Sequence, residues 1–101
     1  MKLKWTRPAV ADRRGIRNYI ARDNISAAIS MDKLFESKAA VLLEHPRLGR
    51  PGRVAGTREL LVHQNYFLVY DLADDDTLVR ILRVMHGARQ WPPVIYSSVP
   101  N

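Results

Sequence analysis

Residues 58–85, RELLVHQNYFLVYDLADDDTLVRILRVM, decide the fold of this chain. They contain three runs rich in β-branched and aromatic residues, at 58–63, 66–72 and 77–85, which predict three strands. Gln64 and Asn65 form the first link and residues 73–76 the second, and strands joined by links this short form an antiparallel meander. The last run is apolar on both faces apart from its arginines. We therefore expect it to be the central strand, covered by helices on one face and by other residues on the second.

A short strand and an amphipathic helix begin the chain. Residues 2–5 alternate lysine with apolar side chains, which predicts a half-buried strand. Residues 8–23 carry apolar side chains at helical spacing, which predicts a helix with a basic outer face. We expect the buried stripe to comprise Ala9, Ile16, Tyr19 and Ile20, and the outer face to carry Asp12, Arg13, Arg14, Arg17 and Arg22.

A second helix and a basic loop connect this helix to the meander. Asn24 or Ser26 can cap a helix that runs to about His45, and Pro46 ends it. Two helices joined this tightly form an antiparallel hairpin. Residues 46–57 then form a loop that carries Arg47, Arg50 and Arg53. The whole is an α+β fold in which the meander joins the first strand in a single sheet. We expect one domain over residues 1–93 and a C-terminal tail over residues 94–101.

Composition narrows the class of protein. The 101 residues are 47% hydrophobic and 26% charged, which is typical of one small globular domain. The absence of cysteine excludes disulfides and cysteine-bound metals. No apolar run approaches the ~18 residues of a membrane span, and the N-terminus lacks the apolar stretch of a signal peptide, so we expect a cytoplasmic protein. The net charge of +6, with 12 arginines among 16 basic residues, indicates an anionic partner: nucleic acid, a nucleic-acid machine or an acidic protein.

Motifs for metals, nucleotides and cofactors are absent from the sequence. His45, His63 and His86 lack the spacing of a metal site, and no phosphate loop, nucleophile elbow or dinucleotide fingerprint occurs, so we expect no metal and no cofactor. The three aspartates at 74–76 indicate a solvated turn. His86 follows a buried strand and lies three residues before Arg89, where it is either structural or able to transfer protons.

Four arginines in and after the strands form a candidate constellation: Arg58, Arg80, Arg83 and Arg89. Because Arg80 and Arg83 are three residues apart in a strand, we expect them to point to opposite faces. Arginines inside a sheet need a partner or a solvated groove. Two interpretations remain open, namely ion pairs with Glu59 and Asp71, or an anion-binding face.

Six short motifs occur in a recognisable order: YIA at 19–21, HP at 45–46, GRPGRV at 49–54, GTREL at 56–60, YFLVY at 66–70 and RVMHGARQWP at 83–92. In this order, over nearly the whole chain, they resemble the RelE/ParE superfamily of bacterial toxins from type II toxin-antitoxin modules, also called plasmid stabilisation proteins. The resemblance implies the α+β fold predicted above. It also implies a cognate antitoxin, whose partly disordered acidic or amphipathic segment folds on the toxin.

The superfamily has two branches with different targets. RelE-like members cut mRNA on the ribosome, with the RNA 2′-hydroxyl as nucleophile, whereas ParE-like members inhibit DNA gyrase. This chain has only four lysines and lacks the RelE-like lysine cluster, and its ending from His86 to Pro92 is similar to ParE-like proteins. We therefore expect a gyrase inhibitor. The alternatives are an mRNA endonuclease and a non-toxic module that binds nucleic acid.

The resemblance also suggests site residues for each activity. The expected target-binding residues are Arg50, Arg53, Arg58, Arg83, Arg89 and Trp91. If the chain is a nuclease, the expected catalytic residues are Arg58, Tyr70, Arg83 and His86.

Overall fold

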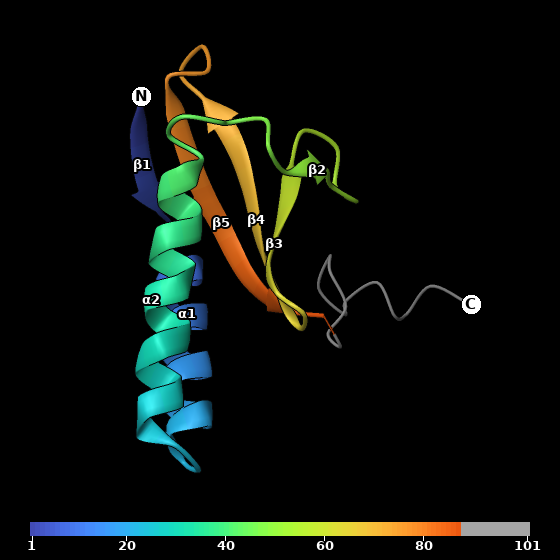
Figure 1. The fold of residues 1–101 in the computed structure, drawn as a ribbon. Helices are drawn as coiled ribbons and strands as arrows, with labels where there is room; N and C mark the ends of the chain where they lie inside the picture. Colours follow the sequence, from blue (N-terminus) through green and yellow to red (C-terminus); the bar gives the residue numbers. More distant parts are fainter. Residues whose placement is uncertain (88–101) are drawn as a thin grey trace, which may run out of the picture.

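The computed structural model describes residues 1–87, which form one mixed sheet and a helical hairpin (Figure 1). The elements are β1 (Lys2–Trp5), α1 (Arg7–Ala21), α2 (Ile25–Val41), β2 (Arg50–Pro51), β3 (Arg58–His63), β4 (Tyr66–Ala73) and β5 (Leu78–His86). The sheet order is β1-β5-β4-β3-β2, with β1 parallel to β5 and the other pairs antiparallel. The predicted α+β fold is confirmed, including the hairpin, the meander and the union of β1 with it.

The ends of the two helices follow from local capping. The Thr6 side chain accepts a hydrogen bond from the Ala9 N–H, and Pro8 lies in the first turn of α1, where its missing N–H has no cost. The Asn24 side chain caps α2 by accepting from the Ala27 N–H at 2.9 Å, so Asn24 is the cap and Ser26 is not. Helix α2 ends at Val41, earlier than the expected end near His45, because a tight turn already begins before Pro46.

Two details of the sheet differ from the sequence-based prediction. The central strand is β4, and β5 lies between β4 and β1. The reason is that strands add at both edges of the meander: β1 pairs with β5, and the unpredicted two-residue strand β2 pairs with β3. Pro51 is compatible with β2 because an edge strand needs fewer backbone donors.

The second difference is a bulge in β5. Val69 is opposite Arg83 and Tyr70 is opposite Ile81, so Leu82 is an extra residue in the strand. Arg80 and Arg83 are therefore opposite Asp71 and Val69, which lie on one face of β4. The expectation that the two arginines point to opposite faces is wrong, because the extra residue changes the alternation.

The main core lies between the helices and one face of the sheet. Phe35 and Leu42, from α2 and the turn after it, pack with Leu68, Tyr70 and Ile81 from the sheet. The other face carries a smaller cluster of Phe67, Val69 and Met85, with Leu82 beside it.

The hairpin projects past the end of the sheet, as its lower half does in Figure 1. This projection explains an error in the predicted stripe of α1. Ala9 is fully buried over the sheet, but Tyr19 is 66% exposed because no strand lies beneath that part of the helix. Asp12 and Arg13, which we expected on the outer face, turn toward the body of the protein and make ion pairs there. No helix of the described chain could cross a membrane. The expected tail at 94–101 lies outside the described residues.

Candidate functional site

Tyr70 and Arg58 hold the start of the basic loop against the sheet. The two residues are opposite one another on β4 and β3. The Tyr70 hydroxyl donates to the Pro46 carbonyl at 2.8 Å and accepts from the Gly49 N–H at 2.9 Å. Arg58 Nη1 donates to the carbonyls of Gly49, at 2.7 Å, and Arg47, at 3.3 Å. Burial raises the pKa of Tyr70, which keeps its hydroxyl protonated and able to donate.

Glu59 organises the rest of this loop from within the sheet. Its carboxylate is buried, with a side chain only 2% exposed, and accepts from Arg50 Nη2 at 3.2 Å and from the Arg53 N–H at 3.1 Å. The Arg53 guanidinium lies 3.8 Å from the same carboxylate and 5.7 Å from the centre of the Phe67 ring. Arg50 and Arg53 are nevertheless 73% and 50% exposed. Glu59 therefore pairs with loop arginines and not with the strand arginines for which we considered it.

The two arginines of β5 each bind a carboxylate. Arg80 binds Asp71, with Nη2 to Oδ2 at 2.6 Å, so one of the anticipated ion pairs is present. Arg83 binds Asp12 of α1 through two hydrogen bonds of 2.8 and 3.0 Å, and Asp12 also accepts from the Val84 N–H at 2.9 Å. Hydrogen bonding to Asp12 raises the pKa of Arg83. Strand β1 pairs with β5 only as far as Ile81, so the Asp12 carboxylate takes the place of a strand partner for the Val84 N–H at this edge.

The proposed catalytic residues do not form one group. Arg58 and Tyr70 are opposite one another in the sheet. Arg83 is opposite Val69, the neighbour of Tyr70, but its guanidinium binds Asp12 of α1, and His86 lies at the end of β5. His86 is opposite Tyr66, four residues from Tyr70 along β4, which corresponds to ~13 Å. Arg89 and Trp91, which we expected at the target-binding surface, lie outside the described residues.

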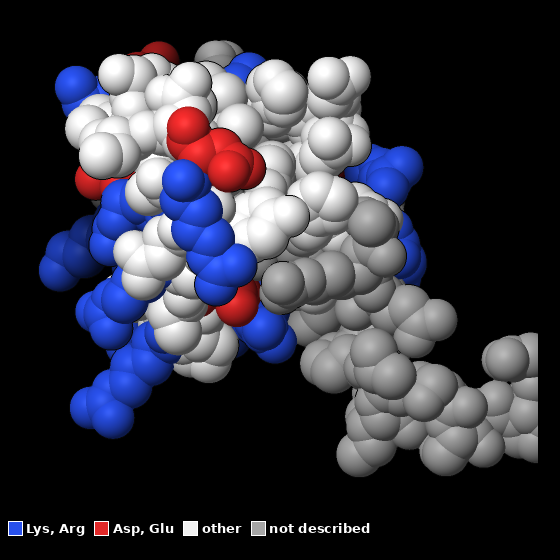
Figure 2. Space-filling model, turned by 90° about the horizontal axis from the view of Figure 1, so that it is seen from below, with Lys and Arg blue, Asp and Glu red and all other residues white. Residues whose placement is uncertain are grey.

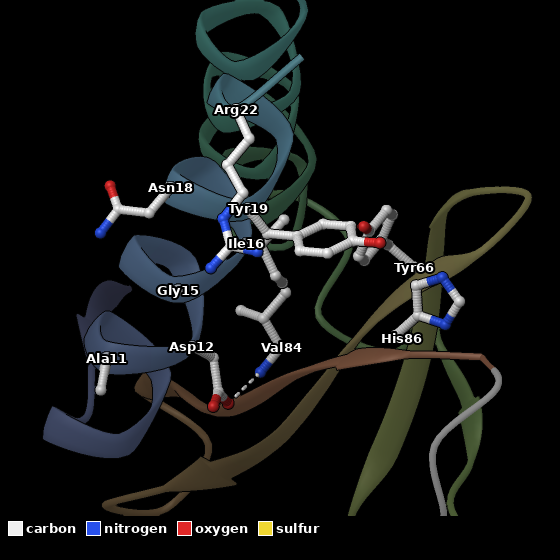
Figure 3. Close-up of a pocket in the computed structure, with 10 residues that line it drawn as sticks. All are labelled: Ala11, Asp12, Gly15, Ile16, Asn18, Tyr19, Arg22, Tyr66, Val84 and His86. Carbon is white, nitrogen blue, oxygen red and sulfur yellow. Dashed lines mark hydrogen bonds between the residues drawn. The ribbon is translucent and has the colours of Figure 1, made fainter. Parts of the chain in front are cut away.

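A cavity of about 580 Å³ lies between α1 and the ends of β4 and β5 (Figure 3). His86 packs edge-on against the Tyr66 ring, with ring centres 4.9 Å apart, and both residues form one wall with Val84. Gly15, Ile16 and Tyr19 are among the residues of α1 that form the opposite wall, and the Tyr19 side chain extends toward Tyr66 in Figure 3. The sequence pattern does not indicate this cavity, because it places Tyr19 in the core. Gly15 in the middle of the predicted helix is the signal that could have indicated it.

Positive charge is concentrated at the N-terminal end of the chain. Residues 1–22 contain seven basic and one acidic residue, so they account for the whole net charge of +6. Residues 23–101 contain nine of each kind. Figure 2 shows basic side chains gathered over the helical hairpin at the left. Arg13 and Arg17 bind Asp32, but in the described part of the chain the exposed Arg7, Arg14 and Arg22 make no ion pair.

Residues 1–87 contain no group of three side chains able to bind a metal. The open, partly aromatic cavity is lined by His86, Asp12 and Arg22 among others.

Comparison with known proteins identifies the family. The model of the ParE toxin of type II toxin-antitoxin systems, parDE, matches residues 3–91. Toxin RelE2 of Caulobacter vibrioides is 40% identical over 85 residues, which span 84% of this chain and 93% of that protein.

Solved structures of two related systems share the fold. The chromosomal ParDE system from P. aeruginosa matches with a TM-score of 0.74 and 26% identity, over 85% of this chain and 95% of that one. The toxin-antitoxin complex RelBE2 from Mycobacterium tuberculosis matches with a TM-score of 0.55 and 28% identity, over 84% and 95%. The chain described here therefore belongs to the ParE toxin family, within the RelE/ParE superfamily of type II toxins.

Proposed function

We propose that this toxin arrests growth by inhibiting DNA gyrase in the cytoplasm and is neutralised by a cognate antitoxin. The separation of the candidate catalytic residues carries this proposal. Cleavage of RNA needs a proton acceptor and cationic groups around one phosphate. Here Arg58 and Tyr70 bind loop carbonyls, and Arg83 binds Asp12. An inhibitor that acts by binding gyrase needs no such assembly. The match to the ParE family model and the likeness to the ParDE system support the same target.

The antitoxin partner has its own support. The RelBE2 structure is that of a toxin-antitoxin complex, and the chain shares its fold over 84% of its length. A strongly basic toxin also favours an acidic partner, because the association of opposite charges is fast and specific.

Arg50 and Arg53 are the described target-binding candidates that we retain. Their guanidinium groups are largely exposed, and a buried carboxylate holds them at the edge of the sheet. Arginines preorganised in this way lose little side-chain entropy on binding an anionic surface. We assign Arg58 and Arg83 to positioning roles, since their donors already bind loop carbonyls and Asp12.

A second candidate function is mRNA cleavage on the ribosome. Two observations favour it: RelE2 is the name of a relative that is 40% identical, and His86 borders an open cavity where it could accept a proton. In this case His86→Gln would abolish cleavage, because glutamine cannot exchange protons near neutral pH.

Purified toxin should be tested in a gyrase supercoiling assay and in a translation reaction with a labelled message. We expect inhibition of supercoiling at micromolar toxin and an intact message. Arg50→Ala with Arg53→Ala should weaken inhibition, whereas Lys33→Ala, which removes a positive charge from α2, should not. Cleavage of the translated message without gyrase inhibition would establish the second function, and neither effect would reject both.

A further inference from the structure

The cavity between α1 and the ends of β4 and β5 contains a tyrosine hydroxyl that has no hydrogen-bond partner in the described chain. Tyr66 lines the cavity and is 9% exposed, yet its hydroxyl makes no hydrogen bond with residues 1–87. Its ring packs edge-on against Phe35 and His86, with ring centres 5.7 and 4.9 Å away, so the hydroxyl is not needed to hold the side chain. A buried polar group of this kind indicates a place where another molecule supplies the hydrogen bond.

Gly15 leaves the opposite wall of the cavity open. A glycine in a helix interior destabilises the helix relative to alanine. A Cβ atom at Gly15 would have no neighbouring atom within 4 Å, so packing in the described chain does not require the glycine. At Gly49, by contrast, a Cβ atom would lie 2.7 Å from the Tyr70 ring. Since Gly15 lines the cavity, the missing side chain leaves room for a flat ligand to lie against the backbone of α1.

Arg22 gives the cavity a positive charge that the described residues do not neutralise. The Asp12 carboxylate also lines the cavity, but Arg83 already binds both of its oxygens. Arg22 is exposed, lies 5.8 Å from the centre of the Tyr19 ring, and forms no salt bridge with residues 1–87. Figure 3 shows its guanidinium reaching back along α1 toward Gly15. An anionic group at the mouth of the cavity would therefore face Arg22.

Aromatic rings and apolar side chains form the remaining walls. The rings of Tyr66 and His86 meet at an angle of 89°, and Ile16 and Val84 add aliphatic surface. The Tyr19 ring is 66% exposed and extends toward Tyr66 (Figure 3). The volume of about 580 Å³ lies within the ~300–1,000 Å³ that is usual for small-molecule sites. Walls of this kind favour a planar ring.

We propose that this cavity binds a small planar aromatic anion. Its ring lies beside Gly15 between Tyr19 and Tyr66, a polar atom of the ring meets the Tyr66 hydroxyl, and its carboxylate or phosphate meets Arg22. An aliphatic anion would gain from Arg22 alone, and a neutral aromatic compound from the walls alone. A ligand with both parts gains from all of these features, so its two ends fix its orientation. The inference concerns the toxin by itself and does not depend on gyrase as the target.

Isothermal titration calorimetry of the full-length toxin tests the two parts of the ligand. The probes are adenosine monophosphate and indole-3-acetate, which both carry an aromatic ring and differ in having a phosphate or a carboxylate. Each has matched controls, since adenosine and indole lack the anionic group, and ribose 5-phosphate and acetate lack the ring. We expect at least one probe to bind with a dissociation constant below about 1 mM. Its two controls should bind at least about tenfold more weakly. The probe that binds more tightly shows whether the ligand is a nucleotide or an aromatic acid.

Three substitutions assign the contacts. Tyr66→Phe removes only the hydroxyl, so it should weaken binding about fivefold and leave the melting temperature nearly unchanged. Arg22→Ala should weaken binding about fivefold or more. Its control is Arg14→Ala, which removes an exposed charge of α1 outside the cavity and should change binding less than about twofold. Gly15→Leu should raise the melting temperature by a few degrees, because leucine favours the helix and meets no neighbour. The same side chain would fill the cavity, so affinity should fall by about tenfold or more.

The inference is overturned if neither probe binds with a dissociation constant below about 1 mM. It is also overturned if Gly15→Leu binds as tightly as the wild type, because the ligand would then lie outside the cavity. Binding of ribose 5-phosphate or acetate as tight as that of the matching probe would exclude a role for the aromatic walls. Gyrase inhibition is measured separately and without these compounds, so failure of this inference leaves the proposed target untouched.

Discussion

Replacing Tyr70 with phenylalanine should release the basic loop from the sheet. The hydroxyl makes two hydrogen bonds, to the Pro46 carbonyl at 2.8 Å and from the Gly49 N–H at 2.9 Å, and the ring is fully buried. Each bond contributes about 1 kcal/mol net, and leaving the N–H of buried Gly49 without a partner adds to the loss, so unfolding should require about 2–3 kcal/mol less free energy. In a domain of this size ~1 kcal/mol corresponds to ~4–8 °C, so the melting temperature should fall by roughly 10–20 °C.

Urea denaturation followed by circular dichroism measures this loss directly. The matched control is Tyr66→Phe, since Tyr66 is on the same strand and face and is 9% exposed, but its hydroxyl makes no hydrogen bond to the described residues. The control should lose less than about 0.5 kcal/mol. Equal losses in the two variants would refute the assigned role of the Tyr70 hydroxyl.

Gyrase inhibition by Tyr70→Phe then shows whether Tyr70 only holds the loop or also acts on the target. At a temperature where Tyr70→Phe is folded, we expect it to retain gyrase inhibition. If activity disappears while the fold remains, Tyr70 acts directly on the target.

Four other perturbations test the described contacts. Burial raises the pKa of Tyr70 above its ordinary 10.0. The neutral phenol therefore stabilises the fold fully below pH 10, and this contribution is lost as the pH rises from 10 through the raised pKa of the folded state. Urea midpoints between pH 9 and about 11 should therefore fall more steeply for the wild type than for Tyr70→Phe. Asp12→Asn should cost about 2–3 kcal/mol by leaving Arg83 with a weakened partner, and adding Arg83→Met should recover part of it in a double-mutant cycle. Gly49→Ala should destabilise by about 2 kcal/mol, because its Cβ would lie 2.7 Å from the Tyr70 ring; an unchanged melting temperature would contradict this contact. Asp75→Gly should raise the free energy of unfolding by about 1 kcal/mol, because Asp75 has a left-handed backbone, with φ 55°, that glycine adopts without strain. A lower free energy of unfolding in urea or hydrogen-exchange experiments would argue against strain in that turn.

Arg80 and Arg83, two of the twelve arginines, form ion pairs within the protein, so the number of arginines does not by itself give the charge available to a partner. We expected strand arginines to face an external anion or an internal carboxylate, and Arg80 and Arg83 bind Asp71 and Asp12. The net charge is instead carried by residues 1–22, where Arg7, Arg14 and Arg22 are exposed. A basic composition therefore predicts an anionic partner but not the face that receives it.

Periodicity and turn residues were sufficient to predict the strands of the meander and the helical hairpin. The β-branched and aromatic runs in residues 58–85 and the link at Gln64 and Asn65 depend on neighbours in sequence, which are always close in space. The bulge at Leu82 and the pairing of Arg50 with Glu59 could not be predicted in this way, because each depends on a register between distant segments.

The sequence by itself determined the class of fold, the basic character and the family resemblance of this protein, since all three are written in local pattern, residue counts and motif order. Only the tertiary structure decided that Tyr70 and Arg58 hold a loop, that Asp12 binds Arg83, and that α1 leaves an open cavity beside its cationic face. The physical reason is that a side chain's partner is set by how the hairpin lies on the sheet. Where the hairpin extends beyond the sheet, as at Tyr19, apolar spacing that predicts burial instead produces a surface.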